Sequence, residues 1–455
     1  MAEGEHGVRA TPRAYVWFPY LMVFVVSFLL YANTIPNGYA LDDKVVIGEN
    51  PFTQKGVGGI RDILTHDTLT GFYGKGQSIV PGGRYRPLSL VTFAVEWQLF
   101  GQNPHLSHLI NVILYALTGV VLYGLLSRLF ADRQVKPRWY FSVPLVATLL
   151  YVAHPLHTEV VANIKARDDI MALLGALLAL RCTLRYLDTD RVIHLVGSSV
   201  AFLLALLSKE NVIAFLAVIP VMVYFCTDHK PRRNAVSVAP LALAAVTYLV
   251  MRHTALAGPK IPTVPDLMNY PFLGSSKARE LATIAYTWLV YVKLLIFPHP
   301  LTYDYYPKQI PIISFTDPRA LAAILVCASL AVVALAGLRK RGVVACGLWF
   351  FGLTFLPVSN LVINVGTFMN ERFMYVPSLG FCLIVAYLLV SRAPGLWKNK
   401  DFARRVLSVG LVVILCLYGT AVVSRNRVWE NDYTLFMHDV KISTRSAKSA
   451  ASAGQ

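Results

Sequence analysis

Two apolar runs, residues 140–156 and 168–187, flank the polar stretch HPLHTEVVANIKARDD, residues 154–169. Each run approaches the ~20 residues that a helix needs to cross a bilayer. Ionisable groups beside hydrocarbon are costly, so a cluster of them there is a site hypothesis by default. Other apolar runs are interrupted or bordered by similar clusters, namely Asp42–Asp43, Lys209–Glu210–Asn211 and Asn370–Glu371–Arg372. The sequence therefore predicts a membrane protein with one polar site.

The composition agrees with this class. Of 455 residues, 56% are hydrophobic and only 15% are charged, and the mean hydropathy is +0.54. A soluble chain carries about 25% charged residues, so we predict an all-α polytopic membrane protein. The net charge of +17 could suggest nucleic acid. However, Lys and Arg concentrate in short linkers between apolar runs, as the positive-inside tendency predicts, and we expect no nucleic-acid partner.

About eleven membrane spans can be drawn along the chain. The six cysteines lie in or beside these apolar runs without metal-ligand spacing, which argues against a zinc site or a disulfide framework. The predicted spans are 15–33, 107–130, 140–156, 168–187, 192–208, 211–227, 235–255, 319–338, 342–363, 373–391 and 403–424.

Basic linkers set the predicted orientation. Arg9 and Arg13 precede the first span, and the basic linkers 128–138 and 230–233 fall on the same side. The run 281–298 is ambiguous, but if it does not cross, the later basic loops join that cytoplasmic side as well. All the polar clusters then face the outer or lumenal side. The first outer loop, 34–106, should hold interfacial helices, since its apolar part is too short to span.

Each cluster permits a structural as well as a chemical interpretation. Adjacent Asp42 and Asp43 could keep one carboxylate ready as a general base, or they could simply cap a helix in a solvated loop. His154 and His157 could form a metal pair with a third ligand. Alternatively, the stretch from His154 to Glu159 could hydrogen-bond a sugar or phosphate, or merely end a helix.

The remaining clusters combine acids with cations. Asp168 and Asp169 suit the positive end of a helix dipole, whereas Arg167 beside them could bind a phosphate. A tight hairpin would explain Lys209, and interfacial anchoring would explain Arg372. Taken together, the clusters offer carboxylates for base chemistry and cations for an anion at one membrane face. That combination indicates an enzyme whose donor is a lipid phosphate.

Several strings resemble one known family. The two most specific strings are residues 154–169 and NERFMYVPSLGF, residues 370–381. Shorter strings agree in order and spacing, at 41–51, 84–89, 208–211 and 425–429. Over about residues 15–450 the chain resembles the transmembrane and tetratricopeptide-repeat O-mannosyltransferases and their bacterial relatives, in the GT-C glycosyltransferase superfamily.

The resemblance implies a GT-C transmembrane domain and an inverting glycosyltransferase. Such an enzyme moves a sugar, typically mannose, from a polyprenyl- or dolichyl-phosphate donor to a Ser or Thr hydroxyl of a protein, without a metal or other cofactor. The catalytic acid of the first outer loop matches Asp42 or Asp43, and Asp42 is favoured. The residues expected around the donor phosphate and sugar are Arg372, Arg167, Lys209, His157, Glu159, Glu371 and Arg86.

Three tyrosines and an acid in Tyr303–Tyr306 are expected at the rim. Asp304 could orient the acceptor or cap a helix, and Tyr305, with Tyr303 and Tyr306, suits a half-wet layer. We predict a transmembrane domain over 1–430 and the start of a tail, where repeats are expected, over 431–455. The active face would be periplasmic in a bacterial inner membrane or lumenal in the endoplasmic reticulum.

Two other functions deserve comparison. A transporter or lipid flippase for a polyprenyl-linked substrate would place polar residues at mid-membrane within inverted repeats, whereas these charges gather at one face. A non-catalytic scaffold or receptor would not need an acid pair beside clustered cations.

Overall fold

The structure is a computed structural model that describes residues 17–74, 83–130, 139–229, 231–257, 267, 270–305 and 309–454. Every regular element in these ranges is a helix or a short helical turn, so the predicted all-α class is confirmed. Six helical segments are long and apolar enough to cross a membrane. They are built on α6 (Pro104–Phe130), α9 (Arg167–Thr189), α12 (Pro231–Ala255), α14 (Pro318–Ala336), α16 (Ser378–Tyr387) and α17 (Lys400–Val428).

A broken helix adds a seventh candidate span. Helix α7 (Val143–Val152) is followed by Pro155–Ala162, which ends in α8 (Thr158–Ala162), and the two parts meet at a bend of 51°. Pro155 stands at this break, and proline has no N–H to continue the hydrogen bonding of a helix. The His154 side chain instead accepts the N–H of Leu156 at 3.3 Å.

Four shorter apolar helices complete the set of predicted spans. They are α1 (Phe18–Tyr31), α10 (Val192–Ser208), α11 (Phe215–Cys226) and α15 (Val343–Phe355). Each predicted span falls on one of these helices or on one of the seven candidates above. The number of helices that cross the membrane stays a prediction.

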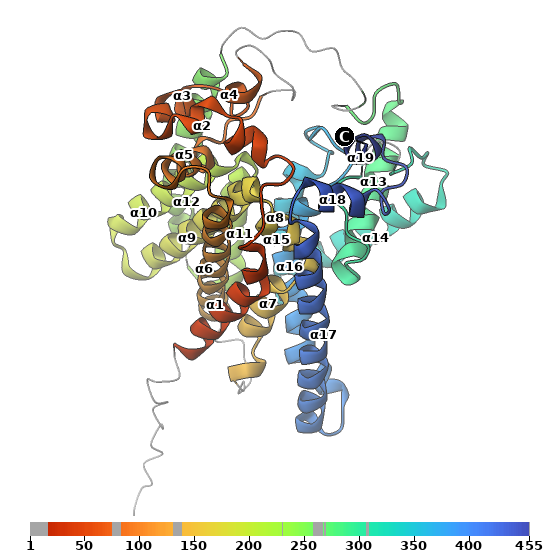
Figure 1. Cartoon of the computed structure of the whole chain (residues 1–455). Coiled ribbons are helices and arrows are strands. Elements are labelled where there is room, and N and C mark those ends of the chain that lie inside the picture. Colours follow the sequence, from red (N-terminus) through yellow and green to blue (C-terminus); the bar gives the residue numbers. More distant parts are fainter. Residues whose placement is uncertain are drawn as a thin grey trace, which may run out of the picture.

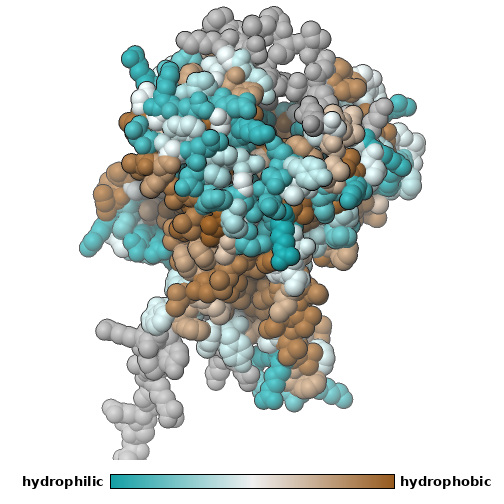
Figure 2. All heavy atoms as spheres, viewed as in Figure 1, coloured by the Kyte–Doolittle hydropathy of each residue, from teal (hydrophilic) through white to brown (hydrophobic). Residues whose placement is uncertain are grey.

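Short helices gather at one end of the bundle. Figure 1 shows α2 (Pro51–Gln54), α3 (Ile60–Thr65), α4 (Thr70–Tyr73) and α5 (Pro87–Phe100) at the same end as α18 (Asp432–Asp439) and α19 (Ala447–Ala453). Helices α1 and α17 begin at the opposite end. In Figure 2 the hydrophilic surface covers the first end, and a hydrophobic belt lies below it. The predicted helices of the first outer loop are therefore present, and they lie above the apolar belt.

Close helix contacts depend on glycine. A Cβ added to Gly175 of α9 would lie 2.9 Å from the Ala205 Cβ of α10. A Cβ added to Gly380 of α16 would lie 2.4 Å from the carbonyl oxygen of Gly347 in α15. Small residues allow helices in a membrane to approach closely, where packing replaces the hydrophobic effect as the main attraction. These contacts pack α9 against α10 and α16 against α15. Helices α9 and α16 begin within the two specific motifs.

Helix α13 (Lys277–Ile296) covers the ambiguous run. Near its end, the carbonyl of Leu295 lies 3.0 Å from His154 Nε2 at the broken span. By Thr302 the chain has returned to the polar end, where the Thr302 N–H donates to Glu371 Oε1 at 2.5 Å. Residues 301–305 thus lie beside the 370–381 string, and whether α13 crosses the membrane stays a prediction.

Candidate functional site

The paired acids of the first outer loop have different surroundings. Asp43 is 1% exposed, and its carboxylate accepts the N–H of Ala40 at 3.0 Å and of Lys165 at 2.7 Å. Burial is the main cause that raises the pKa of Asp43 to about 7, and the neighbouring charge of Asp42 adds to it. Asp43 thus fastens the loop to the α8–α9 connection and is partly protonated near neutral pH.

Asp42 is half-buried and stays ionised. Burial works to raise the pKa of its carboxyl, but four positive charges outweigh burial and hold the pKa below its ordinary value. These charges belong to Lys165, Arg372, Lys448 and Arg84. Of the two acids, Asp42 is therefore the one that keeps a charged carboxylate among cations, as a general base requires.

An ion-pair network lies next to this acid. Arg86 binds both carboxylate oxygens of Glu210, at 2.8 and 2.6 Å, and donates to Asp168 at 2.9 Å. Lys209 Nζ lies 2.5 Å from Asp169 and 3.4 Å from Asp168. Lys165 Nζ lies 3.6 Å from Asp168. The network fixes the positions of these cations, because each of them pairs with an acid on another element or on the next helical turn.

Arg372 uses fewer of its hydrogen-bond donors than Arg86 does. Its Nη1 donates to Glu159 Oε1 at 3.2 Å, and its side chain is 15% exposed. Its buried Nε has no hydrogen-bond partner among the described residues. Buried donors are almost always satisfied, so this one is available to a water or a ligand. A guanidinium with spare donors at a cavity is suited to an oxyanion.

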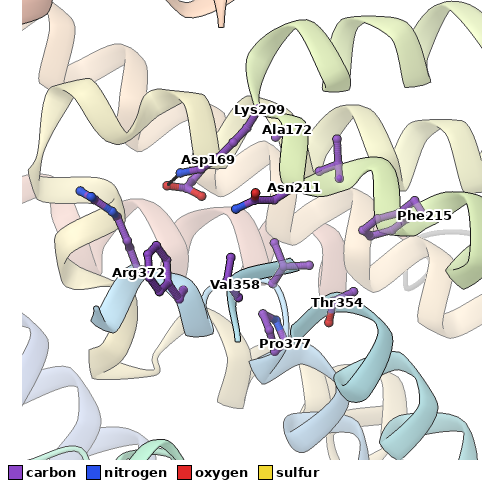
Figure 3. Close-up of a pocket in the computed structure, with 12 residues that line it drawn as sticks. Asp169, Ala172, Lys209, Asn211, Phe215, Thr354, Val358, Arg372 and Pro377 are labelled. Atoms are coloured by element: carbon purple, nitrogen blue, oxygen red, sulfur yellow. Dashed lines mark hydrogen bonds and ion pairs between the residues drawn. The ribbon is translucent and has the colours of Figure 1, made fainter. Parts of the chain in front are cut away.

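A cavity extends from these cations between the helices. It is narrow and partly open to solvent. Figure 3 shows Asp169, Lys209 and Arg372 on one part of its wall, and Phe215, Thr354 and Pro377 farther along. The apolar lining also includes Val212, Val358 and Val376. One end can thus bind a charged group, while the other offers an apolar surface.

Arg167 does not reach this cavity. It is fully buried, and its guanidinium binds Glu96, donates to Asn111 Oδ1 at 2.7 Å and to the Ser107 carbonyl at 3.0 Å, and stacks over the Phe93 ring at 4.3 Å. The prediction that Arg167 surrounds a donor phosphate is therefore not supported. Arg167 instead ties α9 to α5 and α6.

His157 also lies apart from the cavity. Its Nδ1 is 3.0 Å from the Tyr115 hydroxyl and its Nε2 is 2.9 Å from Ser378 Oγ. The ring is fully buried against Tyr151 and Tyr375. His154 likewise uses both ring nitrogens, one toward Leu295 and one toward Leu156. These partners place His157 in the helix packing and not beside a sugar, and they occupy the nitrogens that a metal pair would need.

The other predicted residues divide into two groups. Glu159 and Arg86 lie next to the cluster, as partners of Arg372 and Asp168. Glu371 instead accepts hydrogen bonds from the Thr302 N–H and from the Tyr305 hydroxyl, the latter at 2.8 Å. Asp304 binds Ser446 Oγ. Since Asp304 and Tyr305 are both buried, they do not form an exposed rim. Tyr306 lies outside the described residues.

The tail after the last span is part of this end of the molecule. Asp439 of α18 accepts two hydrogen bonds from Arg425 and one from the Tyr303 N–H at 2.7 Å. Thr302 and Ser443 hydroxyls lie 2.8 Å apart. The predicted tail is 431–455, and its described part contacts Thr302, Tyr303 and Gln309.

Sequence reasoning missed three cations near Asp42, namely Lys165, Arg84 and Lys448. Lys165 lies within the 154–169 motif and three residues before Asp168, which is the spacing of an ion pair along a helix. Arg84 opens the string at 84–89. The spacing and the string were visible signals, but the loop containing Arg84 is distant in sequence from Asp42.

The fold and the site define a class: a helical membrane protein with a charged cluster at one end of an amphipathic cavity. Two sequence profiles match the chain. The profile described as dolichyl-phosphate-mannose-protein mannosyltransferase covers residues 87–256. The profile described as protein O-mannosyl-transferase TMTC, DUF1736, covers residues 271–331.

Known relatives agree with the profiles. The chain is 29% identical to human protein O-mannosyl-transferase TMTC1, over 93% of this chain and 51% of that protein. It is 27% identical to mouse TMTC3, over 94% and 48%, and 26% identical to protein O-mannosyl-transferase F38B6.6 of Caenorhabditis elegans, over 94% and 58%. The chain is thus related to the TMTC protein O-mannosyl-transferases, and it spans about half the length of these relatives.

Proposed function

We propose that this chain is an inverting glycosyltransferase that moves mannose from a polyprenyl- or dolichyl-phosphate donor to a Ser or Thr hydroxyl of a protein. The observation that carries the proposal is the position of Arg372. This arginine has spare donors, lines a cavity that turns apolar, and contributes to the electrostatic environment of the ionised Asp42. A lipid phosphate needs both a cationic and an apolar surface.

In the proposed reaction, the donor phosphate lies near Arg372 and Lys209, and the lipid follows the apolar lining of the cavity. The acceptor oxygen attacks the anomeric carbon while Asp42 takes the hydroxyl proton. The bond from that carbon to the phosphate oxygen breaks, and the phosphate leaves with the electron pair. Arg372 stabilises the charge that develops on the leaving oxygen. We propose that these fixed cations do this without a metal.

Inversion follows from attack opposite the leaving phosphate. We place this chemistry on the lumenal or periplasmic face. Helix α17 begins, beside its basic linker 392–405, at the end of the molecule opposite the short helices, and basic linkers favour the cytoplasmic side. The acceptor protein would then approach Asp42 from the hydrophilic end.

The proposal can be tested with the purified chain in lipid nanodiscs. Radiolabelled polyprenyl-phosphate mannose is added with a peptide that contains one serine, and a second peptide has alanine there. We expect label only on the serine peptide, with the anomeric configuration opposite to that of the donor. Absence of transfer from polyprenyl- and dolichyl-linked donors alike would refute the proposal, and retention of configuration would refute the one-step mechanism.

A further inference from the structure

The residue before Asp42 has an unusual backbone conformation. Leu41 has φ +55°, in the left-handed region that side chains with a Cβ rarely occupy. Such a conformation persists only where the surrounding structure holds it, and it is concentrated at functional sites. Something must therefore hold Leu41, and its direct neighbour is the proposed general base.

Asp432, the first residue of α18, supplies the restraint. Its Oδ1 accepts the N–H of Leu41 at 2.6 Å, and its Oδ2 lies 2.8 Å from Lys44 Nζ. One carboxylate thus binds the residue before and the residue after the Asp42–Asp43 pair. Asn37 adds a second connection, because its side-chain amide donates to the carbonyls of Asn426 and Trp429 at 3.2 Å.

The opposite side of the loop is held separately. Asp43 binds the Lys165 N–H at the start of the span built on α9. Asp42 therefore stands between two anchors, one on the α8–α9 connection and one on the segment after the last span. Without the second anchor, Leu41 is free to relax to negative φ, which rotates the peptide that carries Asp42.

We propose that Asp432 is a positioning residue for Asp42, and that the segment after α17 completes the catalytic site in this way. The proposal rests on the transferase function proposed above. Asp432 does not touch substrate in this account. It acts by fixing the backbone of Leu41, so its loss should lower turnover more than donor affinity.

The kinetic test compares four variants in the nanodisc assay. Asp432→Ala should lower kcat about 10- to 100-fold, as expected for a misplaced catalytic group, with the donor KM little changed. Asp432→Asn retains an oxygen acceptor for the Leu41 N–H and should lose less. Glu49→Gln removes an exposed acid from the same loop and is the matched control, expected to equal the wild type.

The fourth variant separates positioning from general stability. Leu41→Gly relieves the steric cost of positive φ. In the Asp432→Ala background it should therefore recover kcat about fivefold or more. A merely structural role for Asp432 predicts that Leu41→Gly raises the melting midpoint without raising the kcat of the folded protein. Failure of this rescue, or an unchanged kcat in Asp432→Ala, would overturn the proposal.

Hydrogen exchange measured by mass spectrometry gives a second readout that does not need activity. Asp432→Ala should speed exchange in peptides that cover residues 38–44 and leave those of α9 unchanged. Equal exchange in wild type and variant would refute the restraint. If the wild type transfers no sugar, the proposed function fails, while the exchange result still decides whether Asp432 holds this loop.

Discussion

Arg167 and Arg372 have similar sequence contexts and different environments. Each lies inside one of the two specific strings and next to an acid. Each also forms an ion pair with a glutamate. The Arg167 guanidinium binds Glu96, Asn111, Thr92 and a carbonyl. Arg372 binds Glu159 and retains a buried Nε without a partner among the described residues. Burial and charge alone therefore do not distinguish the two arginines, whereas the unused Nε of Arg372 beside the cavity does.

The largest effect on turnover is expected at Asp42, whose carboxylate is stabilised by the charge of Arg372. Asp42→Asn should lower turnover about 10²- to 10⁴-fold, because the variant cannot take the acceptor proton. Asp43→Asn should lower thermal stability more than turnover, since Asp43 carries backbone hydrogen bonds. Single-turnover rates and melting midpoints of both variants check this. Inactive Asp43→Asn with a nearly normal Asp42→Asn would move the base one residue along.

Arg167 should behave as part of the framework. Arg167→Met leaves Glu96 without its charged partner, and breaking a buried ion pair in this way costs about 3–5 kcal/mol. The melting midpoint should fall, and Glu96→Gln in the same background should restore part of it. Donor affinity of the protein that remains folded should equal the wild type. Normal stability combined with lost donor binding would place Arg167 in the site and break the comparison.

Substitution of Arg372 should act mainly on donor binding. A hydrogen bond to a charged group contributes about 1.5–3 kcal/mol, so Arg372→Ala should weaken donor binding about 10- to 100-fold. Arg372→Lys keeps the charge but not the planar fork, and its affinity should be intermediate. The double variant Arg372→Ala with Glu159→Gln controls for the acid left unpaired. Unchanged donor affinity in both single variants would contradict the assigned role.

A further prediction concerns the pH dependence of stability at Glu371. Burial raises the pKa of this carboxyl from 4.5 to about 8. Because the folded value is the higher one, the stabilisation is present below the unfolded pKa and is lost as the pH rises through the folded value. Glu371→Gln removes this loss, so its melting midpoint minus that of the wild type should rise between about pH 5 and pH 8.5. A constant difference would contradict the raised pKa.

The sequence was sufficient to locate the helices. Their apolar runs are long, and Pro155 at the broken span and the short run at Pro87–Gly101 also carried clear signals. The site was predicted only in part. Lys209 and Arg372 line one cavity, Glu159 pairs with Arg372, and the charge of Arg372 acts on Asp42.

The errors have a common physical origin. Adjacent residues of a helix point about 100° apart, so Arg167 faces α5 and α6 while Asp168 faces Arg86 and Lys209. A linear motif does not reveal this division. Nor could it show that Tyr115 and Ser378 would enclose His157, or that Asp432 would reach the loop of Asp42, since these partners come from distant segments.

The central claim is that Arg372 binds the donor while Asp42 performs the chemistry. Measuring donor binding and transfer separately tests it most directly. Binding of tritiated polyprenyl-phosphate mannose to nanodisc-embedded protein is measured beside single-turnover transfer, for the wild type, Asp42→Asn and Arg372→Ala. We expect Asp42→Asn to bind the donor like the wild type and to transfer almost none, and Arg372→Ala to bind it weakly. Transfer by Asp42→Asn at close to the wild-type rate would contradict the account.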